Sequence, residues 1–152
     1  MPTLVVVSCG KRKVWNDRPS AGPTRARDAY TGIPYKTYRE YAERFSDKWV
    51  ILSAKHGFLE PDSIIPEDYN VTFEDPLTNP ISTLELAKQV RQNDLDKYDL
   101  VIVLGGRSYT NAVSQAFSGS RVLIKKPLEG LRLGYSVQAV KNAIRQNRLL
   151  EH

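Results

Sequence analysis

The sequence predicts an α/β fold: a single Rossmann-like three-layer domain with a mostly parallel, four-stranded sheet. Two observations favour this class. Short apolar runs alternate along the chain with segments of helical spacing, and the runs are apolar throughout, as in strands that helices cover on both faces. Two long irregular segments, 14–32 and 57–80, each follow a predicted strand. We therefore expect both loops to lie over the carboxyl edge of the sheet.

The individual elements follow from periodicity and capping residues. Valine-rich Thr3–Ser8 predicts the first strand, and three further apolar runs predict the others, at Lys48–Ser53, Asp99–Leu104 and Arg121–Ile124. Apolar residues at helical spacing predict four helices, over Pro34–Phe45, from Ser82 or Thr83 to Asn93, Ser108–Phe117 and Tyr135–Leu150. We expect residues 1–149 to form one domain, while residues 150–152 could be the remnant of an expression tag.

The composition indicates a globular protein in a reducing compartment. The chain has 152 residues, of which 41% are hydrophobic and 26% charged. Cys9 is the one cysteine, so no internal disulfide can form, and the cytoplasm is the expected setting. The apolar runs are too short to span a bilayer, and no signal peptide is visible, so we expect no membrane partner.

The charge balance favours an anionic partner. Lysine and arginine exceed aspartate and glutamate by 22 to 17, which gives +5 and suggests a nucleotide or nucleic acid. Ordinary solubility is the alternative explanation of this charge. The basic residues gather beside turns and predicted strand ends, at Lys11, Arg12, Lys13, Arg25, Arg27, Lys55, Arg107, Lys125 and Lys126.

Four segments follow the predicted strands and meet at the edge where open α/β sheets bind ligands. They begin at Ser8, Ser53, Gly105 and Lys125. Gly105-Gly106 would let the backbone approach a ligand, and the following helix would present free N–H groups to a phosphate. A plain tight turn is the alternative. The dinucleotide and P-loop fingerprints are both absent, so we expect no cofactor of either kind.

Cys9 is a candidate nucleophile. Nearby Lys11 and Lys13 would favour its thiolate, and His56 on the adjacent loop could act as a base. The alternative is a half-buried cysteine that fills space at a strand end. One cysteine and one internal histidine do not make a tetrahedral zinc site, so we expect no metal.

The second long loop is acidic and carries aromatic rings. Asp68-Tyr69 combines a carboxylate with a ring that can stack on a base, and Asp28-Ala29-Tyr30 does the same in the first loop. The carboxylates could position a water or contact the polar edge of a base. A solvated loop is the alternative for most of the acidic residues, which are Glu60, Asp62, Glu67, Asp68, Glu74 and Asp75.

Several motifs together resemble a domain family of unknown function found in bacteria, archaea and phages. They are SCGKRK from Ser8, ARDAYTG from Ala26, ILSAKHGFLEPD from Ile51, PEDYNVTF from Pro66, VLGGRSY from Val103 and PLEGLRLG from Pro127. The chain is more distantly similar to the peroxide-stress protein family and to the archaeosine synthase core domain. Those similarities imply nucleic acid and a uracil-DNA-glycosylase-like fold. The Asp-Pro-Tyr-His stretch of the glycosylases is absent, so that activity does not carry over.

We therefore expect an enzyme that acts on a nucleotide, or on a base in DNA or RNA, through N-glycosidic or base-modifying chemistry. The alternative is a non-catalytic DNA-binding module in stress response or phage defence, and a metabolite-binding regulatory domain comes third. The expected catalytic residues are Cys9, Lys55, His56, Asp28 and Asp68. The expected binding residues are Ser8, Gly10, Lys11, Lys13, Tyr30, Ser53, Tyr69, Gly105, Gly106, Arg107, Ser108 and Lys126.

Overall fold

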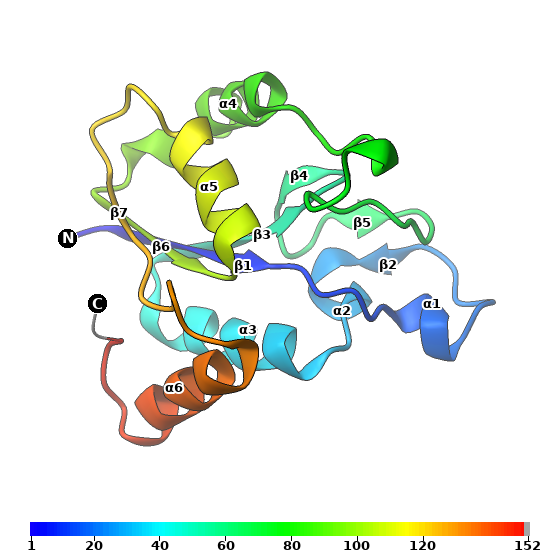
Figure 1. The fold of residues 1–152 in the computed structure, drawn as a ribbon, viewed down its shortest axis with the longest axis horizontal. Helices are drawn as coiled ribbons and strands as arrows, with labels where there is room; N and C mark the ends of the chain where they lie inside the picture. The colour runs from blue at the N-terminus through cyan, green and yellow to red at the C-terminus, as the bar shows by residue number, and fades with distance from the viewer. Residues whose placement is uncertain (151–152) are drawn as a thin grey trace.

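The structure is a computed structural model that describes residues 1–150, and it has three layers. A central sheet has α4 and α5 on one face and α3 and α6 on the other (Figure 1). The α-helices are α1 (Val14–Asp17), α2 (Ala26–Ala29), α3 (Ile33–Phe45), α4 (Thr83–Gln92), α5 (Arg107–Ala116) and α6 (Leu133–Arg145). The strands are β1 (Thr3–Ser8), β2 (Thr24–Arg25), β3 (Lys48–Ser53), β4 (Gly57–Leu59), β5 (Ile64–Ile65), β6 (Leu100–Leu104) and β7 (Leu123–Lys125).

The central sheet has five strands in the order β4-β3-β1-β6-β7. Strands β3, β1, β6 and β7 run parallel, whereas β4 pairs antiparallel with β3. The predicted α/β class and mostly parallel sheet are thus confirmed, with one strand more than expected. Strand β1 lies between β3 and β6. After β1 the chain forms β3 on one side of it, and later β6 on the other side. The carboxyl ends of β1 and β6 therefore form the switch point where such sheets bind ligands.

Burial on both faces explains why the strands read as continuous apolar runs. Leu4, Val5, Val6 and Val7 of β1 are all fully buried. Alternate side chains point to opposite faces, so Val5 and Val7 pack with α3 and α6, while Leu4 and Val6 pack with α4 and α5. The domain consequently has two apolar clusters with the sheet between them.

The two segments predicted as long irregular loops contain more regular structure than expected. The first loop holds α1, β2 and α2, and the second holds β4, β5 and the 3₁₀ helix η1 (Pro76–Thr78). Strands β2 and β5 pair antiparallel, which ties the two loops together. Elements of two to four residues are too short to show a period in the sequence, which is why the prediction missed them.

The helix boundaries agree closely with the prediction except at the end of the chain. Ser82 caps α4, because its hydroxyl accepts from the Glu85 amide at 3.1 Å. The last helix was predicted over Tyr135–Leu150 but ends at Arg145, and Asn147 adopts the left-handed conformation (φ 52°). Leu150 then packs back on the domain, and its amide donates to the Tyr41 hydroxyl at 3.1 Å. Residues 151–152 lie outside the described part.

Within residues 1–150, no helix combines the length and the apolar character needed to cross a membrane.

Candidate functional site

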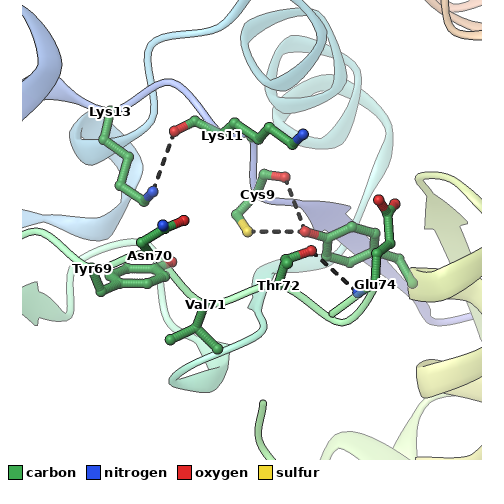
Figure 2. A pocket seen from close by; sticks show the side chains of 10 residues that line it. Cys9, Lys11, Lys13, Tyr69, Asn70, Val71, Thr72 and Glu74 are labelled. Carbon is green, nitrogen blue, oxygen red and sulfur yellow. Dashed lines mark hydrogen bonds between the residues drawn. The ribbon is translucent and has the colours of Figure 1, made fainter. Parts of the chain in front are cut away.

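A pocket of about 300 Å³ lies at the carboxyl ends of β1 and β6, where the segment that follows β1 meets the second long loop. The segment after β1 forms one wall and the second long loop forms the opposite wall (Figure 2). Tyr109 of α5 completes the lining. Its lining residues are Cys9, Gly10, Lys11, Lys13, Tyr69, Asn70, Val71, Thr72, Glu74 and Tyr109. The pocket thus combines cations, a carboxylate, a thiol and aromatic rings.

Cys9 lies at the centre of this pocket, between Lys13 and Glu74 in Figure 2. Its sulfur is 3.3 Å from the Tyr109 hydroxyl, which also donates to the Cys9 carbonyl at 3.4 Å. Burial raises the pKa of the Cys9 thiol above 9.0, and the hydrogen bond from Tyr109 and the charge of Lys13 lower it by less. Lys13 thus favours the thiolate, as the sequence indicates, but desolvation is the larger effect and the pKa of the thiol is raised overall.

A glycine allows this contact between β1 and α5. An added Cβ on Gly105 would stand 2.8 Å from the Ser8 Cβ and 3.2 Å from the Tyr109 Cβ. Gly105 therefore serves the close approach of the two strand ends, and Tyr109 reaches Cys9 as a result. Gly106, in contrast, has open space around it. It is the N-cap residue of α5 and makes no side-chain capping hydrogen bond.

Hydrogen bonds fix the Tyr69 ring in the pocket wall. Its hydroxyl bonds to the Tyr30 hydroxyl and lies 2.8 Å from the Ser53 hydroxyl. Ser53 accepts from the amides of Lys55 and His56 at 3.2 and 3.1 Å, which leaves its own proton for Tyr69. Burial raises the pKa of Tyr30 and of Tyr69 above the ordinary value of a tyrosine, so both side chains are neutral phenols. Tyr30 and Ser53 thus support the wall from behind and do not line the pocket.

Two lysines approach the Tyr69 ring, but only one of them lines the pocket. The Lys13 nitrogen lies 4.6 Å from the ring centroid and the Lys55 nitrogen 5.7 Å. Lys13 is only 8% exposed, and its ammonium donates to the Lys11 carbonyl at 3.2 Å. Lys55 is exposed and is absent from the lining.

His56 packs behind Tyr69 and is also absent from the pocket lining. The His56 and Tyr69 rings meet edge to face, with centroids 5.1 Å apart. The Nε2 atom is buried without a hydrogen-bond partner within residues 1–150. Burial, followed by the charge of Lys55, lowers the pKa of His56, which keeps the ring neutral. Since Cys9 bonds to Tyr109, the structure does not bring His56 and Cys9 together as a hydrogen-bonded pair.

The two aspartates expected near the chemistry lie elsewhere. Asp28 is exposed and forms ion pairs with Arg25 at 3.8 Å and with Arg39 at 3.6 Å. Asp68 is exposed, and its carboxylate accepts from the Tyr69 amide at 2.8 Å. Neither side chain lines the pocket.

The basic residues that follow β6 and β7 face a different hollow. Gly106 and Arg107 line a second pocket of about 370 Å³, together with Arg132 and the segment 128–131. Ser108 lines a shallow hollow between α4 and α5. Lys126 makes an ion pair with Glu129 at 3.9 Å. None of these residues therefore lines the main pocket.

Five pocket residues were not in the predicted site, namely Asn70, Val71, Thr72, Glu74 and Tyr109. All of them fall inside PEDYNVTF and VLGGRSY or directly after the first of these motifs. Of the six acidic residues in the second loop, Glu74 is the one that lines the pocket. Within residues 1–150, no three His, Cys, Asp or Glu side chains gather in a way that could hold a metal ion.

A family model described as "Family of unknown function (DUF6884)" matches residues 4–142, which include every residue of the pocket. The chain belongs to this family. The match agrees with the domain family of unknown function that the sequence motifs indicated.

This family member is similar in sequence to a Bacillus protein and in structure to AF0587. It is 37% identical over 151 residues to "Uncharacterized protein YfjM" of Bacillus subtilis (strain 168), covering 99% of this chain and 100% of that protein. Among solved structures, it matches AF0587, a protein of unknown function, at 12% identity and a TM-score of 0.46. That match covers 99% of this chain and 44% of the AF0587 chain, so this protein spans less than half of its length.

Proposed function

We propose that the pocket binds a nucleotide, free or as one residue of DNA or RNA, and that the protein is an enzyme acting on its N-glycosidic bond or its base. The observation that carries this proposal is Lys13, a buried cation in a pocket wall. No carboxylate among residues 1–150 lies within ion-pair distance of its ammonium. The Lys11 carbonyl and the Tyr69 ring are the neutral partners of this ammonium. Burying a cation without an opposite charge is costly, and a bound phosphate would supply that charge.

The backbone beside Lys13 supports a phosphate in the same place. Within residues 1–150, the amides of Gly10, Lys11 and Arg12 donate no hydrogen bond. Successive free N–H groups after a strand are a common anion-binding arrangement. Lys11 lines the pocket with an exposed side chain, so it adds a second cation at the entrance.

The size and the walls of the pocket fit one nucleotide. A volume of about 300 Å³ is at the lower end of the range for ligand sites, which suits a single base and sugar phosphate and not a duplex. The rings of Tyr69 and Tyr109 supply aromatic wall. Cys9 and Glu74 supply a thiol and a carboxylate, the groups that covalent and acid–base catalysis use.

The distant similarity of the motifs to the peroxide-stress proteins and to the archaeosine synthase core also supports a nucleic-acid substrate.

A non-catalytic DNA-binding module is the second candidate. It is favoured by Arg107 and Arg132, which line the second pocket beside the exposed start of α5. These arginines, with the net charge of +5, offer a basic surface outside the main pocket. A module of this kind would bind DNA without changing it.

The proposal is tested by titrating nucleoside monophosphates, single-stranded DNA and RNA at low salt, by calorimetry. Lys13→Met should weaken mononucleotide binding by at least about tenfold, because a charge-assisted contact is lost. Lys36→Met, at an exposed position on α3, is the matched control and should bind normally. Lys13→Met should remain folded, since it replaces a buried charge with an apolar chain of similar size.

Mass spectrometry of the nucleotides after incubation separates the two candidates. Release or modification of a base identifies the enzyme, whereas binding of DNA with no product identifies the module. Failure to bind any mononucleotide, DNA or RNA at low salt would rule out both.

A further inference from the structure

A short segment, residues 72–78, forms the end of the pocket opposite Lys13, and we call it the rim. Contacts within the segment and with α5 hold it in place. The Thr78 hydroxyl accepts from the Thr72 amide at 3.0 Å, and its one proton is shared between the Asp75 carbonyl at 2.7 Å and the Thr72 carbonyl at 3.0 Å. The neighbouring ring of Phe73 packs edge to face on Tyr109, with centroids 5.4 Å apart. The rim is therefore held by hydrogen bonds within it and by the packing of Phe73 on α5. Glu74 belongs to this fixed segment.

Two residues of this rim, Thr72 and Glu74, line the pocket with hydrogen-bonding side chains. The Glu74 carboxylate lines the pocket and makes no ion pair within residues 1–150, although Lys11 lines the same pocket. The Thr72 hydroxyl accepts from the Glu74 amide at 3.2 Å and donates no hydrogen bond within the described residues, so its proton is free. The rim thus offers the pocket a hydroxyl donor and two carboxylate acceptors.

Lys13 and Glu74 lie at opposite ends of the pocket, with Cys9 between them (Figure 2). A nucleotide whose phosphate meets Lys13 would therefore turn its base towards Thr72 and Glu74. The polar edge of that base must present one acceptor beside two donors to match the rim.

We infer that Glu74 and Thr72 select a guanine nucleotide, a step that rests on the proposed nucleotide binding. The guanine edge places the O6 acceptor beside the N1–H and N2–H donors, so Thr72 donates to O6 and Glu74 accepts both N–H groups. Adenine and cytosine place a ring-nitrogen acceptor beside the amino group, which the carboxylate repels. Uracil and thymine flank their single N–H with two carbonyl oxygens, one of which would face the carboxylate.

The selection is tested by measuring the affinities of GMP, IMP, AMP, CMP and UMP for the full chain by calorimetry. IMP is the decisive probe, because it keeps O6 and N1–H but lacks the N2 amino group. GMP should bind at least about tenfold more tightly than IMP, the effect of one hydrogen bond to a charged group. AMP, CMP and UMP should bind more weakly than GMP.

Glu74→Gln should bring the affinity for GMP down to that for IMP. The side-chain NH₂ of Gln is a donor and would face the N–H donors of guanine. Glu67→Gln is the matched control, since Glu67 is exposed in the same loop and does not line the pocket. Binding of all five monophosphates with equal affinity, or a preference for GMP that survives Glu74→Gln, overturns the selection and leaves nucleotide binding intact. Binding of none of them overturns the proposed function itself.

Discussion

Cys9 shares the pocket with Lys13, yet its surroundings act on the thiol in opposite directions. Removal from water disfavours the thiolate, while Tyr109 and Lys13 favour it, and the first effect is the larger. The thiol is therefore protonated at neutral pH. A nucleophilic role would require the ligand to change this balance, for example by bringing a proton acceptor to the sulfur.

Slow alkylation of Cys9 is the first prediction. Because the pKa of the thiol is raised, iodoacetamide should label the folded protein more slowly at neutral pH than the unfolded protein. The rate should rise as the pH rises, since the thiolate reacts. Tyr109→Phe should slow labelling further at a given pH, because it removes a hydrogen bond that lowers the thiol pKa. The rates are measured by mass spectrometry of the alkylated chain.

Tyr135→Phe serves as the control for this experiment, because Tyr135 is 70% exposed on α6 and away from the pocket. If the folded and unfolded proteins label at the same rate at neutral pH, Cys9 is an activated thiol and the burial argument is wrong.

Between elements, a single glutamine side chain connects α4 to the β3–β4 hairpin. Gln89 accepts from the Phe58 amide at 2.8 Å and donates to the His56 carbonyl at 3.0 Å. Gly57 lies between these two contacts with φ 76°, and an added Cβ there would stand 2.1 Å from the Gln89 oxygen. The glycine therefore meets two requirements, a left-handed backbone and the close approach of the glutamine.

Loss of this connection should destabilise the fold. Gln89→Ala leaves one backbone N–H and one C=O of the hairpin without their partner, which should lower the free energy of unfolding by about 1–3 kcal/mol. Gln92→Ala, at an exposed position of the same helix, makes the same chemical change and should alter it by less than about 0.5 kcal/mol. Urea unfolding followed by circular dichroism measures both. Equal effects of the two substitutions would show that the connection contributes nothing.

For the whole molecule, the concave shape of the pocket would limit which nucleic acids could bind there under the proposed function. A base inside a duplex can enter only if it leaves the stack, which costs a few kcal/mol. The basic residues outside the pocket, such as Arg107 and Arg132, carry no such restriction. The two surfaces should therefore differ in their preference for single strands.

We expect a single-stranded oligonucleotide to bind at least about tenfold more tightly than the duplex of the same sequence at fixed salt. Lys13→Met should remove most of this difference, whereas Lys36→Met should preserve it. Fluorescence anisotropy with labelled oligonucleotides measures the affinities. Equal binding of both forms, unaffected by Lys13→Met, would favour the DNA-binding module on the outer surface.

The sequence by itself determined the layered core of this protein. Residues 4–7 are apolar without interruption, and the fold buries all four because helices cover both sheet faces. Tyr38, Tyr41 and Ala42 recur at helical spacing and are all buried on α3. Such patterns can be read along the chain because each arises from burial of one face of a local element.

Only the tertiary structure decided which loop residues share the pocket. Glu74 and Asp68 lie in one acidic loop, but only Glu74 lines the pocket. The sulfur of Cys9 meets Tyr109, 100 residues away, and not the histidine that follows the neighbouring strand. Loop side chains have no period that fixes their direction. Their placement depends on contacts between distant segments, which form only when the whole domain has packed.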